Sequence, residues 1–166
     1  MKLAPGVGFG DGSHATTRLC LRAIKSLAPR REGWRLLDFG AGNGILSIAG
    51  ILQGAVADAV EIDPGALAHA RENAALNQVA LHTAASLEGL DGPYDFIVAN
   101  ILRAILLEHA EALCRRLTPG GGLVLSGLTA TDLPEVSVRY GALLGRRPES
   151  YALDDWRALA WRPHVE

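Results

Sequence analysis

The segment that most constrains the fold of this chain covers residues 36–48 and has the sequence LLDFGAGNGILSI. It begins as an apolar run, passes through Gly40, Gly42 and Gly44 at every second position, and leaves as an apolar, helix-forming stretch. Glycine adopts the positive φ angles of a tight turn and lets a ligand lie against bare backbone. Backbone N–H groups at the start of the following helix then face that ligand. The segment therefore predicts a strand, a ligand-binding turn and a helix.

An acid stands just before this turn and bears on the identity of the ligand. The carboxylate of Asp38 would repel the pyrophosphate of a dinucleotide, whereas it suits a ligand that carries a positive charge. S-adenosylmethionine carries a sulfonium and an α-ammonium group. We therefore predict that the turn binds S-adenosylmethionine, in preference to the nicotinamide cofactor of a dehydrogenase. The predicted contacts in this segment are Asp38, Gly40, Ala41, Gly42 and Gly44.

Strand-like and helix-like segments alternate through the chain, which is typical of an α/β protein with a doubly wound parallel sheet. Strands are predicted at residues 35–39, 57–62, 80–83, 94–99 and 123–126, and helices at 13–27, from the glycine turn to 53, and at 65–77, 103–117 and 132–144. Ser13 or Thr16 is expected to cap the first helix, and residues 119–122 to form a turn. Residues 146–152 and 157–162 predict a closing antiparallel hairpin. We expect a single domain over residues 1–166, with a lid loop and helix at 1–34.

Polar residues follow the predicted strands at their carboxyl ends, where open parallel sheets bind ligands. Glu61 ends the second strand at a spacing that suits a carboxylate bound to ribose hydroxyls, although such an acid can also be purely structural. Asp63 precedes a proline and is expected to cap a helix. Ser86 and Leu87 follow the third strand and are predicted to flank an adenine ring. Asn100 either caps the next helix or presents its carbonyl oxygen to an incoming nucleophile, and we favour the second role.

Composition and charge argue against several classes of function. Hydrophobic residues make up 49% and charged residues 20%, as in a globular chain, and the net charge of −2 gives no strong attraction to nucleic acid or anionic membranes. The pairs Arg30 and Arg31, Arg115 and Arg116, and Arg146 and Arg147 are expected on the solvated surface. The longest apolar runs are too short to cross a bilayer, and no signal peptide is expected.

The remaining special residues give weaker signals. Cys20 and Cys114 lie in helical patterns and are expected to be buried thiols, so we predict no disulfide, no metal site and a cytoplasmic location. His14 lies in a glycine-rich entrance and is a candidate substrate contact, whereas the other four histidines are expected at the surface or flanking a helix. The three tryptophans, Trp34, Trp156 and Trp161, are expected to pack at the sheet edges.

Two motifs together resemble the class I S-adenosylmethionine-dependent methyltransferases, namely DFGAGNG at residues 38–44 and VEIDP at residues 60–64. Three further segments narrow the resemblance to the PrmA family, which methylates amino groups of a large-subunit ribosomal protein. They are GFGDGSHATT at residues 8–17, VANIL at 98–102, and LTPGG at 117–121 leading to LSG at 125–127. The resemblance covers essentially the whole chain and implies a seven-stranded, Rossmann-like sheet.

The resemblance also implies roles for individual residues. The segment with Thr16 and Thr17 closes over the cofactor, the glycines approach its methionine part, Glu61 holds its ribose, and Asn100 lies beside the methyl group. Asp11 stands where the family usually has threonine and adds a charge near this segment. The predicted cofactor-binding residues are Phe9, Thr16, Thr17, Asp38, Gly40, Ala41, Gly42, Gly44, Glu61, Ile62, Ser86, Leu87 and Asn100, of which Asn100 is also the predicted catalytic residue.

The predicted activity is S-adenosylmethionine-dependent N-methylation of protein amino groups by in-line displacement. The family carries a substrate-recruiting domain before its catalytic domain, and this chain begins where the catalytic domain begins, as an excised domain or a stand-alone relative. Methylation of a small amine, or cofactor binding by a module that needs a partner chain, therefore stays open. A nucleic-acid adenine methyltransferase is disfavoured because Ile101, Leu102 and Arg103 follow Asn100, in place of prolines and a base-stacking aromatic. We thus expect neither a nucleic acid nor a membrane as partner.

Overall fold

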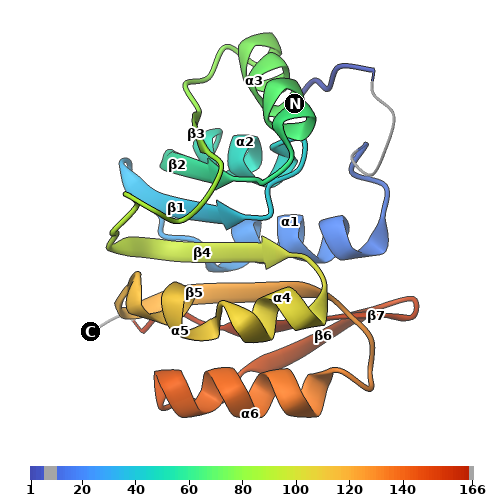
Figure 1. Cartoon of the computed structure of the whole chain (residues 1–166), viewed down its shortest axis with the longest axis vertical. Coiled ribbons are helices and arrows are strands. Elements are labelled where there is room, and N and C mark those ends of the chain that lie inside the picture. The colour runs from blue at the N-terminus through green and yellow to red at the C-terminus, as the bar shows by residue number, and fades with distance from the viewer. Residues whose placement is uncertain (6–10, 165–166) are drawn as a thin grey trace.

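The computed structural model describes residues 1–5 and 11–164. Its strands are β1 (Trp34–Phe39), β2 (Ala55–Val60), β3 (His82–Ala84), β4 (Tyr94–Asn100), β5 (Leu117–Leu128), β6 (Glu149–Leu153) and β7 (Trp156–Trp161). Its helices are α1 (Ala15–Leu27), α2 (Ile45–Ile51), α3 (Pro64–Leu76), α4 (Arg103–Glu108), α5 (Ala110–Arg115) and α6 (Leu133–Leu144). The strands form one sheet that is covered by helices (Figure 1).

The strand order in the sheet is β3-β2-β1-β4-β5-β7-β6. The first five strands of the sequence pair in parallel, whereas β7 is antiparallel to both β5 and β6. This confirms the predicted doubly wound α/β sheet with a closing antiparallel hairpin. The parallel strands all end at one edge, on the right in Figure 1, which we call the carboxyl edge; we call the opposite edge the amino edge.

The sheet divides the hydrophobic core into two clusters, one on each face. The strands contribute side chains to both clusters, because successive side chains of a strand point to opposite faces. In β1, Leu36 packs with residues of α1 and α2, whereas Leu37 packs with residues of α4, α5 and α6. In β4, Val98 joins the first cluster and Ile97 the second. The nearly continuous apolar runs of these strands follow from burial on both faces.

β5 is longer than predicted, and the expected turn at residues 119–122 is wrong. The pairing of β5 with β4 shifts between Tyr94, which is opposite Leu117, and Phe96, which is opposite Gly122. The intervening residues therefore form a bulge inside the strand. A Cβ atom at Gly122 would lie 2.5 Å from the Phe96 ring, so this glycine permits the close pairing after the bulge.

The helix predicted at residues 103–117 is two helices. His109 separates α4 from α5 with φ −94° and ψ 7°, and its ring packs against Phe39 with the centroids 5.0 Å apart. The cap of α1 also differs from the prediction. It is His14, whose Nδ1 accepts a hydrogen bond from the Thr16 N–H at 3.3 Å, rather than Ser13 or Thr16 itself.

The prediction that the arginine pairs lie on the solvated surface is only partly correct. Arg116 and Arg146 are half-buried, whereas the other four arginines are exposed, and one member of each pair binds the amino edge of the sheet. Arg31 donates to Asp95 at 2.8 Å. Arg116 donates to three backbone carbonyl oxygens, and Arg146 donates to the carbonyl oxygens of Gly121 and Arg162. Backbone carbonyls where irregular segments meet the sheet need donors, and a guanidinium supplies several in a fixed geometry.

Two of the three tryptophans are interior residues of inner strands, contrary to the prediction that they pack at the outer strands of the sheet. Trp34 and Trp161 are fully buried, because β1 and β7 are flanked by strands on both sides. Both cysteines are free thiols; Cys20 is buried as predicted, whereas Cys114 is partly exposed. Within the described residues, no helix is both long and apolar enough to cross a membrane.

Candidate functional site

The glycine turn connects β1 to α2 at the carboxyl edge and is held against β2. The N–H groups of Gly40 and Ala41 donate to the Val60 carbonyl oxygen at 2.8 and 2.9 Å. Gly40 has φ +78°, and a Cβ atom there would lie 2.1 Å from Ile101 Cγ2. Gly44 also has φ +78°, and its Cβ position is 3.0 Å from that of Ala70 in α3. Glycine is thus required both for the backbone conformation and for the close approach of neighbouring segments.

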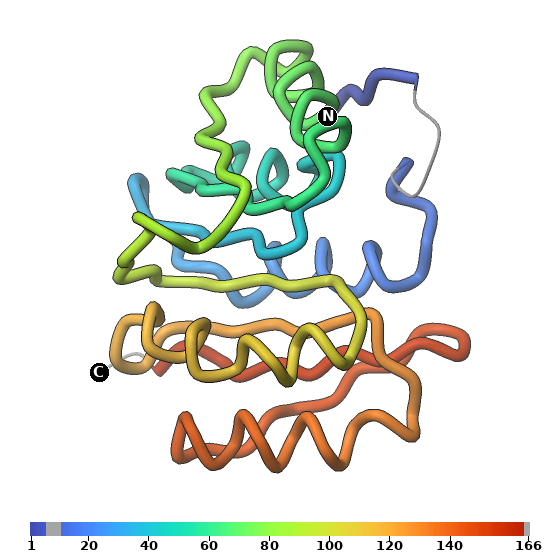
Figure 2. Tube along the Cα trace, viewed as in Figure 1, coloured from blue at the N-terminus to red at the C-terminus, as the bar shows by residue number. Residues whose placement is uncertain are grey.

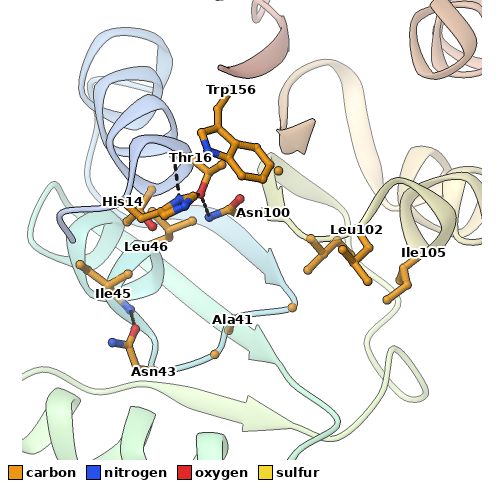
Figure 3. Close-up of a pocket in the computed structure, with 15 residues that line it drawn as sticks. His14, Thr16, Ala41, Asn43, Ile45, Leu46, Asn100, Leu102, Ile105 and Trp156 are labelled. Atoms are coloured by element: carbon orange, nitrogen blue, oxygen red, sulfur yellow. Dashed lines mark hydrogen bonds between the residues drawn. The ribbon is translucent and has the colours of Figure 1, made fainter. Parts of the chain in front are cut away.

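A cavity of about 360 Å³ opens beside this turn (Figure 3). This volume lies within the range of small-molecule sites. The predicted site residues that line it are Thr16, Thr17, Gly40, Ala41, Gly42 and Asn100, and His14, the candidate substrate contact, lines it as well. The structure thus brings together the start of α1, the glycine turn and the end of β4, which are far apart in the sequence.

Asp38 is buried beneath the turn, with an exposed fraction of 1%. Its Oδ2 accepts hydrogen bonds from the Ser47 N–H at 2.9 Å and the Ser47 hydroxyl at 2.7 Å. Its Oδ1 is buried and has no hydrogen-bond partner in the described part of the chain. The pKa of Asp38 is raised to about 6, chiefly by burial and to a smaller extent by the nearby charge of Glu61, although the two Ser47 hydrogen bonds lower it. An unpartnered carboxylate oxygen of this kind suits a cationic ligand group.

Glu61 follows β2 and joins two backbone segments of the site. Its Oε2 accepts from the Gly42 N–H and its Oε1 from the Asp63 N–H, both at 3.0 Å. Each carboxylate oxygen retains a second lone pair, so the group can also accept from two hydroxyls of a ligand. Asp63 caps α3 as predicted, because its carboxylate accepts from the Gly65 and Ala66 N–H groups.

Asn100 does not cap the helix that follows it. The N-cap of α4 is Leu102, which has no side-chain capping bond. Instead, the Asn100 side-chain Nδ2 donates to Thr16 Oγ1 at 3.2 Å, and Thr16 Oγ1 lies 2.7 Å from His14 Nδ1. Because His14 Nδ1 also accepts from the Thr16 N–H, we assign the Thr16 hydroxyl as donor to that nitrogen. The amide nitrogen of Asn100 is thereby oriented, and its carbonyl oxygen Oδ1 is the group that can accept from a ligand.

The mouth of the cavity contains residues that the sequence analysis did not assign to the site. Trp156 lies above Thr16 and Asn100, and its ring packs edge-on against that of His14 with centroids 5.2 Å apart (Figure 3). Leu102, which is 71% exposed, and Ile105 line another part of the cavity. A signal for Trp156 was present in the predicted hairpin: since β7 runs antiparallel to β5, its first residue lies at the carboxyl edge.

Several predicted residues lie elsewhere. The predicted residues that do not line the cavity are Asp38, Gly44, Glu61, Ile62, Ser86 and Leu87. Ile62 and Ser86 are exposed, and the Ser86 hydroxyl accepts from the Glu88 N–H, whereas the Leu87 side chain is buried in the core. Their predicted contacts with a ribose and adenine therefore stay predictions.

The predicted cofactor contact of Phe9 and the predicted lack of a metal site also stay predictions. Phe9 lies outside the described residues. Within residues 1–5 and 11–164, no group of three or more His, Cys, Asp or Glu side chains could hold a metal ion.

Solved structures with this architecture define the class of the fold. A ribosomal protein L11 methylase from Lactobacillus delbrueckii subsp. bulgaricus superposes with a TM-score of 0.84 at 32% identity, over 98% of this chain and 84% of that chain. A T. thermophilus 16S rRNA N2 G1207 methyltransferase, solved with AdoMet and guanosine, superposes with a TM-score of 0.80 over 96% of this chain and 46% of that chain. At 22% identity the second likeness shows the fold alone. The fold is that of the class I methyltransferases.

The family follows from the sequence relatives. Residues 1–163 match the family described as Ribosomal protein L11 methyltransferase (PrmA), and the chain belongs to this family. A ribosomal protein L11 methyltransferase of Thiobacillus denitrificans is 48% identical over 84% of this chain and 47% of its own length. One of Trichlorobacter lovleyi is 41% identical over 96% of this chain and 55% of its own length. The chain thus spans about half the length of these relatives.

Proposed function

We propose that this chain is an S-adenosylmethionine-dependent N-methyltransferase that acts on an amino group of a protein, with ribosomal protein L11 as the acceptor for which its relatives are named. The observation that carries this proposal is the position of the Asn100 amide, which Thr16 orients at the cavity beside the glycine turn. The same proposal places the reaction in the cytoplasm.

The residues at the turn fit this cofactor. The buried, unpartnered Oδ1 of Asp38 offers a negative charge to an ammonium or sulfonium group. The backbone of Gly40 and Gly42 lines the cavity without side chains, which leaves room for the methionine part of the cofactor. Glu61 retains lone pairs for ribose hydroxyls next to Gly42. When bound, S-adenosylmethionine supplies a methyl group on a sulfonium, which passes to the amine by in-line displacement.

The acceptor amine enters past Trp156, Leu102 and Ile105. A lysine side chain has a pKa of about 10.4 in water and must lose its proton before it can attack. An apolar mouth next to a cationic group disfavours the charged ammonium and so promotes this loss. The Asn100 carbonyl oxygen then accepts one N–H of the neutral amine and directs its lone pair. In this scheme the protein accelerates the reaction by placing two reactants in line, so that neither a nucleophilic side chain nor a general base in contact with the amine is required.

The test measures transfer of a radiolabelled methyl group. We expect incorporation into isolated ribosomal protein L11, with little into a panel of small amines, and binding of S-adenosylmethionine in a calorimetric titration. Transfer to small amines alone would instead support a small-molecule methyltransferase. Cofactor binding without transfer to either acceptor would support a binding module that needs a partner chain. Including an RNA acceptor tests the prediction that nucleic acid is not a substrate.

A further inference from the structure

A segment formed by residues 1–5, which we call the strap, begins beside α3 (Figures 1 and 2) and is bound to this helix by hydrogen bonds. Two asparagines one helical turn apart bind its backbone. Asn77 Oδ1 accepts from the Lys2 N–H at 2.7 Å, and Asn77 Nδ2 donates to the Lys2 carbonyl oxygen at 2.6 Å. Asn73 Oδ1 accepts from the Ala4 N–H at 2.7 Å. Helix positions four apart share one face, and alternate residues of an extended segment point the same way, so the two spacings match.

The other end of the Asn73 amide binds the glycine turn. Asn73 Nδ2 donates to the Asn43 carbonyl oxygen at 2.9 Å, and Asn43 lines the cavity of the candidate site. Asn73 is fully buried, so neither end of its amide can exchange its protein partner for water without a rearrangement. A single side chain therefore joins the strap to the cofactor turn, two segments about 40 residues apart in the sequence.

We propose that Asn73 is a positioning residue for the cofactor site, and that it couples docking of the strap to the conformation of the glycine turn. The inference rests on the proposed function, because the ligand of the turn is S-adenosylmethionine there. If the strap leaves α3, Asn73 Oδ1 loses its donor from Ala4, and the amide is no longer held in its orientation. The bond from Asn73 Nδ2 to Asn43 is weakened as a result. A ligand that binds the ordered turn consequently stabilises the docked strap, and by linkage the docked strap tightens ligand binding.

Two substitutions each remove one of the two hydrogen bonds by which Asn73 connects the strap to the glycine turn. Ala4→Pro removes the N–H that the strap donates and leaves Asn73 intact. Asn73→Asp keeps the acceptor for Ala4 but replaces the donor to Asn43 with a second acceptor. Asn77→Asp is the matched comparison, because it makes the same chemical change one turn away. It removes the donor to the backbone carbonyl oxygens of Lys2 and Asn73, while both side-chain bonds of Asn73 stay in place.

The measurements are the Kd of S-adenosylmethionine by calorimetry, kcat at saturating cofactor, and thermal unfolding. We expect A4P and N73D each to raise the Kd about fivefold, as for the loss of one hydrogen bond, with kcat unchanged within twofold. We expect N77D to lower the unfolding temperature and to change the Kd less than twofold. The double variant A4P/N73D should bind S-adenosylmethionine no more weakly than the weaker-binding single variant, because both substitutions break the same connection between the strap and the glycine turn.

A second readout does not depend on activity. In the wild-type chain, added S-adenosylmethionine should slow hydrogen exchange of the Lys2 and Ala4 amides, and N73D should abolish that protection. A purely structural role predicts lower unfolding temperatures with an unchanged Kd and no cofactor-dependent protection, and that result overturns the inference. If N73D does not fold, A4P decides the question alone. A wild-type chain that does not bind the cofactor would overturn the proposed function itself, and this inference with it.

Discussion

Polar side chains at the two edges of the sheet differ in what they bind. At the amino edge, Arg116 donates to the carbonyl oxygens of Leu90, Ala112 and Leu87 at 2.6, 2.8 and 3.1 Å. At the carboxyl edge, Asp38 keeps one buried oxygen without a hydrogen-bond partner among the described residues. A side chain that hydrogen-bonds to other parts of the protein stabilises the fold. A buried polar atom that lacks a hydrogen-bond partner can instead be stabilised further by a ligand.

The comparison of the two edges also distinguishes the arginine pairs from the acidic residues at strand ends, although the two patterns are similar in the sequence. The arginine pairs and the acids at strand ends are both short polar patterns next to apolar runs. The two edges differ in the chain segments that meet them. Segments enter the amino edge with irregular backbone carbonyls that need donors, whereas the carboxyl edge carries the glycine turn and the cavity beside it. Substitutions at the amino edge should therefore change stability, and those at the carboxyl edge should change binding and turnover.

The largest effect is expected for Asn100→Ala. The variant loses the carbonyl oxygen that we propose directs the amine, so turnover should fall about 100-fold while the Kd of S-adenosylmethionine changes little. Single-turnover methyl transfer and calorimetry measure the two quantities. Thr16→Val is the companion variant: it keeps the amide but removes the hydroxyl that orients it, and should lose less activity. Equal losses of turnover and cofactor affinity in N100A would argue against the assigned role.

The next effect tests the amino edge. Arg116→Met keeps much of the side-chain volume but removes three donors to backbone carbonyls, and should lower the free energy of unfolding by about 2 kcal/mol. Chemical denaturation measures this change. The exposed neighbour Arg115 provides the control, since Arg115→Met should change stability by less than about 0.5 kcal/mol. A weakened cofactor affinity in R116M would break the distinction between the two edges.

The pH dependence of cofactor binding tests the buried acid. Because the pKa of Asp38 is raised to about 6, its carboxyl becomes neutral as the pH falls through that value, and its attraction for a cationic ligand is lost. The affinity for S-adenosylmethionine should then be about tenfold lower at pH 5 than at neutral pH, and Asp38→Asn should flatten the profile. Calorimetry between pH 5 and 8 provides the measurement. An identical profile in wild type and D38N would exclude Asp38 as the group responsible.

Asp38 also links stability to pH with a definite sign. Its pKa in the folded protein lies above the ordinary value of 3.8, so between those values the folded state binds the proton more tightly than the unfolded chain. The contribution of this group to stability is therefore greatest at low pH and falls as the pH rises through about 6. In D38N this slope should disappear, and denaturant midpoints at pH 4.5 and 7 compare the two proteins.

The smallest effect is expected at the mouth of the cavity. Trp156→Ala removes the aromatic wall next to His14, and should raise the KM for the protein acceptor about threefold while the cofactor Kd stays unchanged. Steady-state kinetics at saturating cofactor measure the change. Trp156→Phe preserves an aromatic face and should recover part of the affinity. If W156A raised the Kd of S-adenosylmethionine more than the KM for the protein acceptor, Trp156 would be a contact of the cofactor instead.

Much of the fold was predictable because its signals are local. The glycine turn between two apolar segments, the buried runs of β1 and β4, and the position of Asn100 at a strand end each arise within a few residues. The parallel arrangement then follows, since alternating strands and helices pack in one way and place every strand end at the same edge. The capping of α3 by Asp63 has the same local origin.

Other features depended on the tertiary structure because they join distant residues. The bond from Asn100 to Thr16, the contact of His14 with Trp156, and the bridge that Asn73 forms between Ala4 and Asn43 have no periodic or compositional signature. The bulge in β5 likewise depends on its pairing with β4. The sequence alone thus determined the class of fold and the edge that carries the site. Only the folded chain decided which side chains meet there, because a long-range contact is set by the packing of whole elements rather than by neighbouring residues.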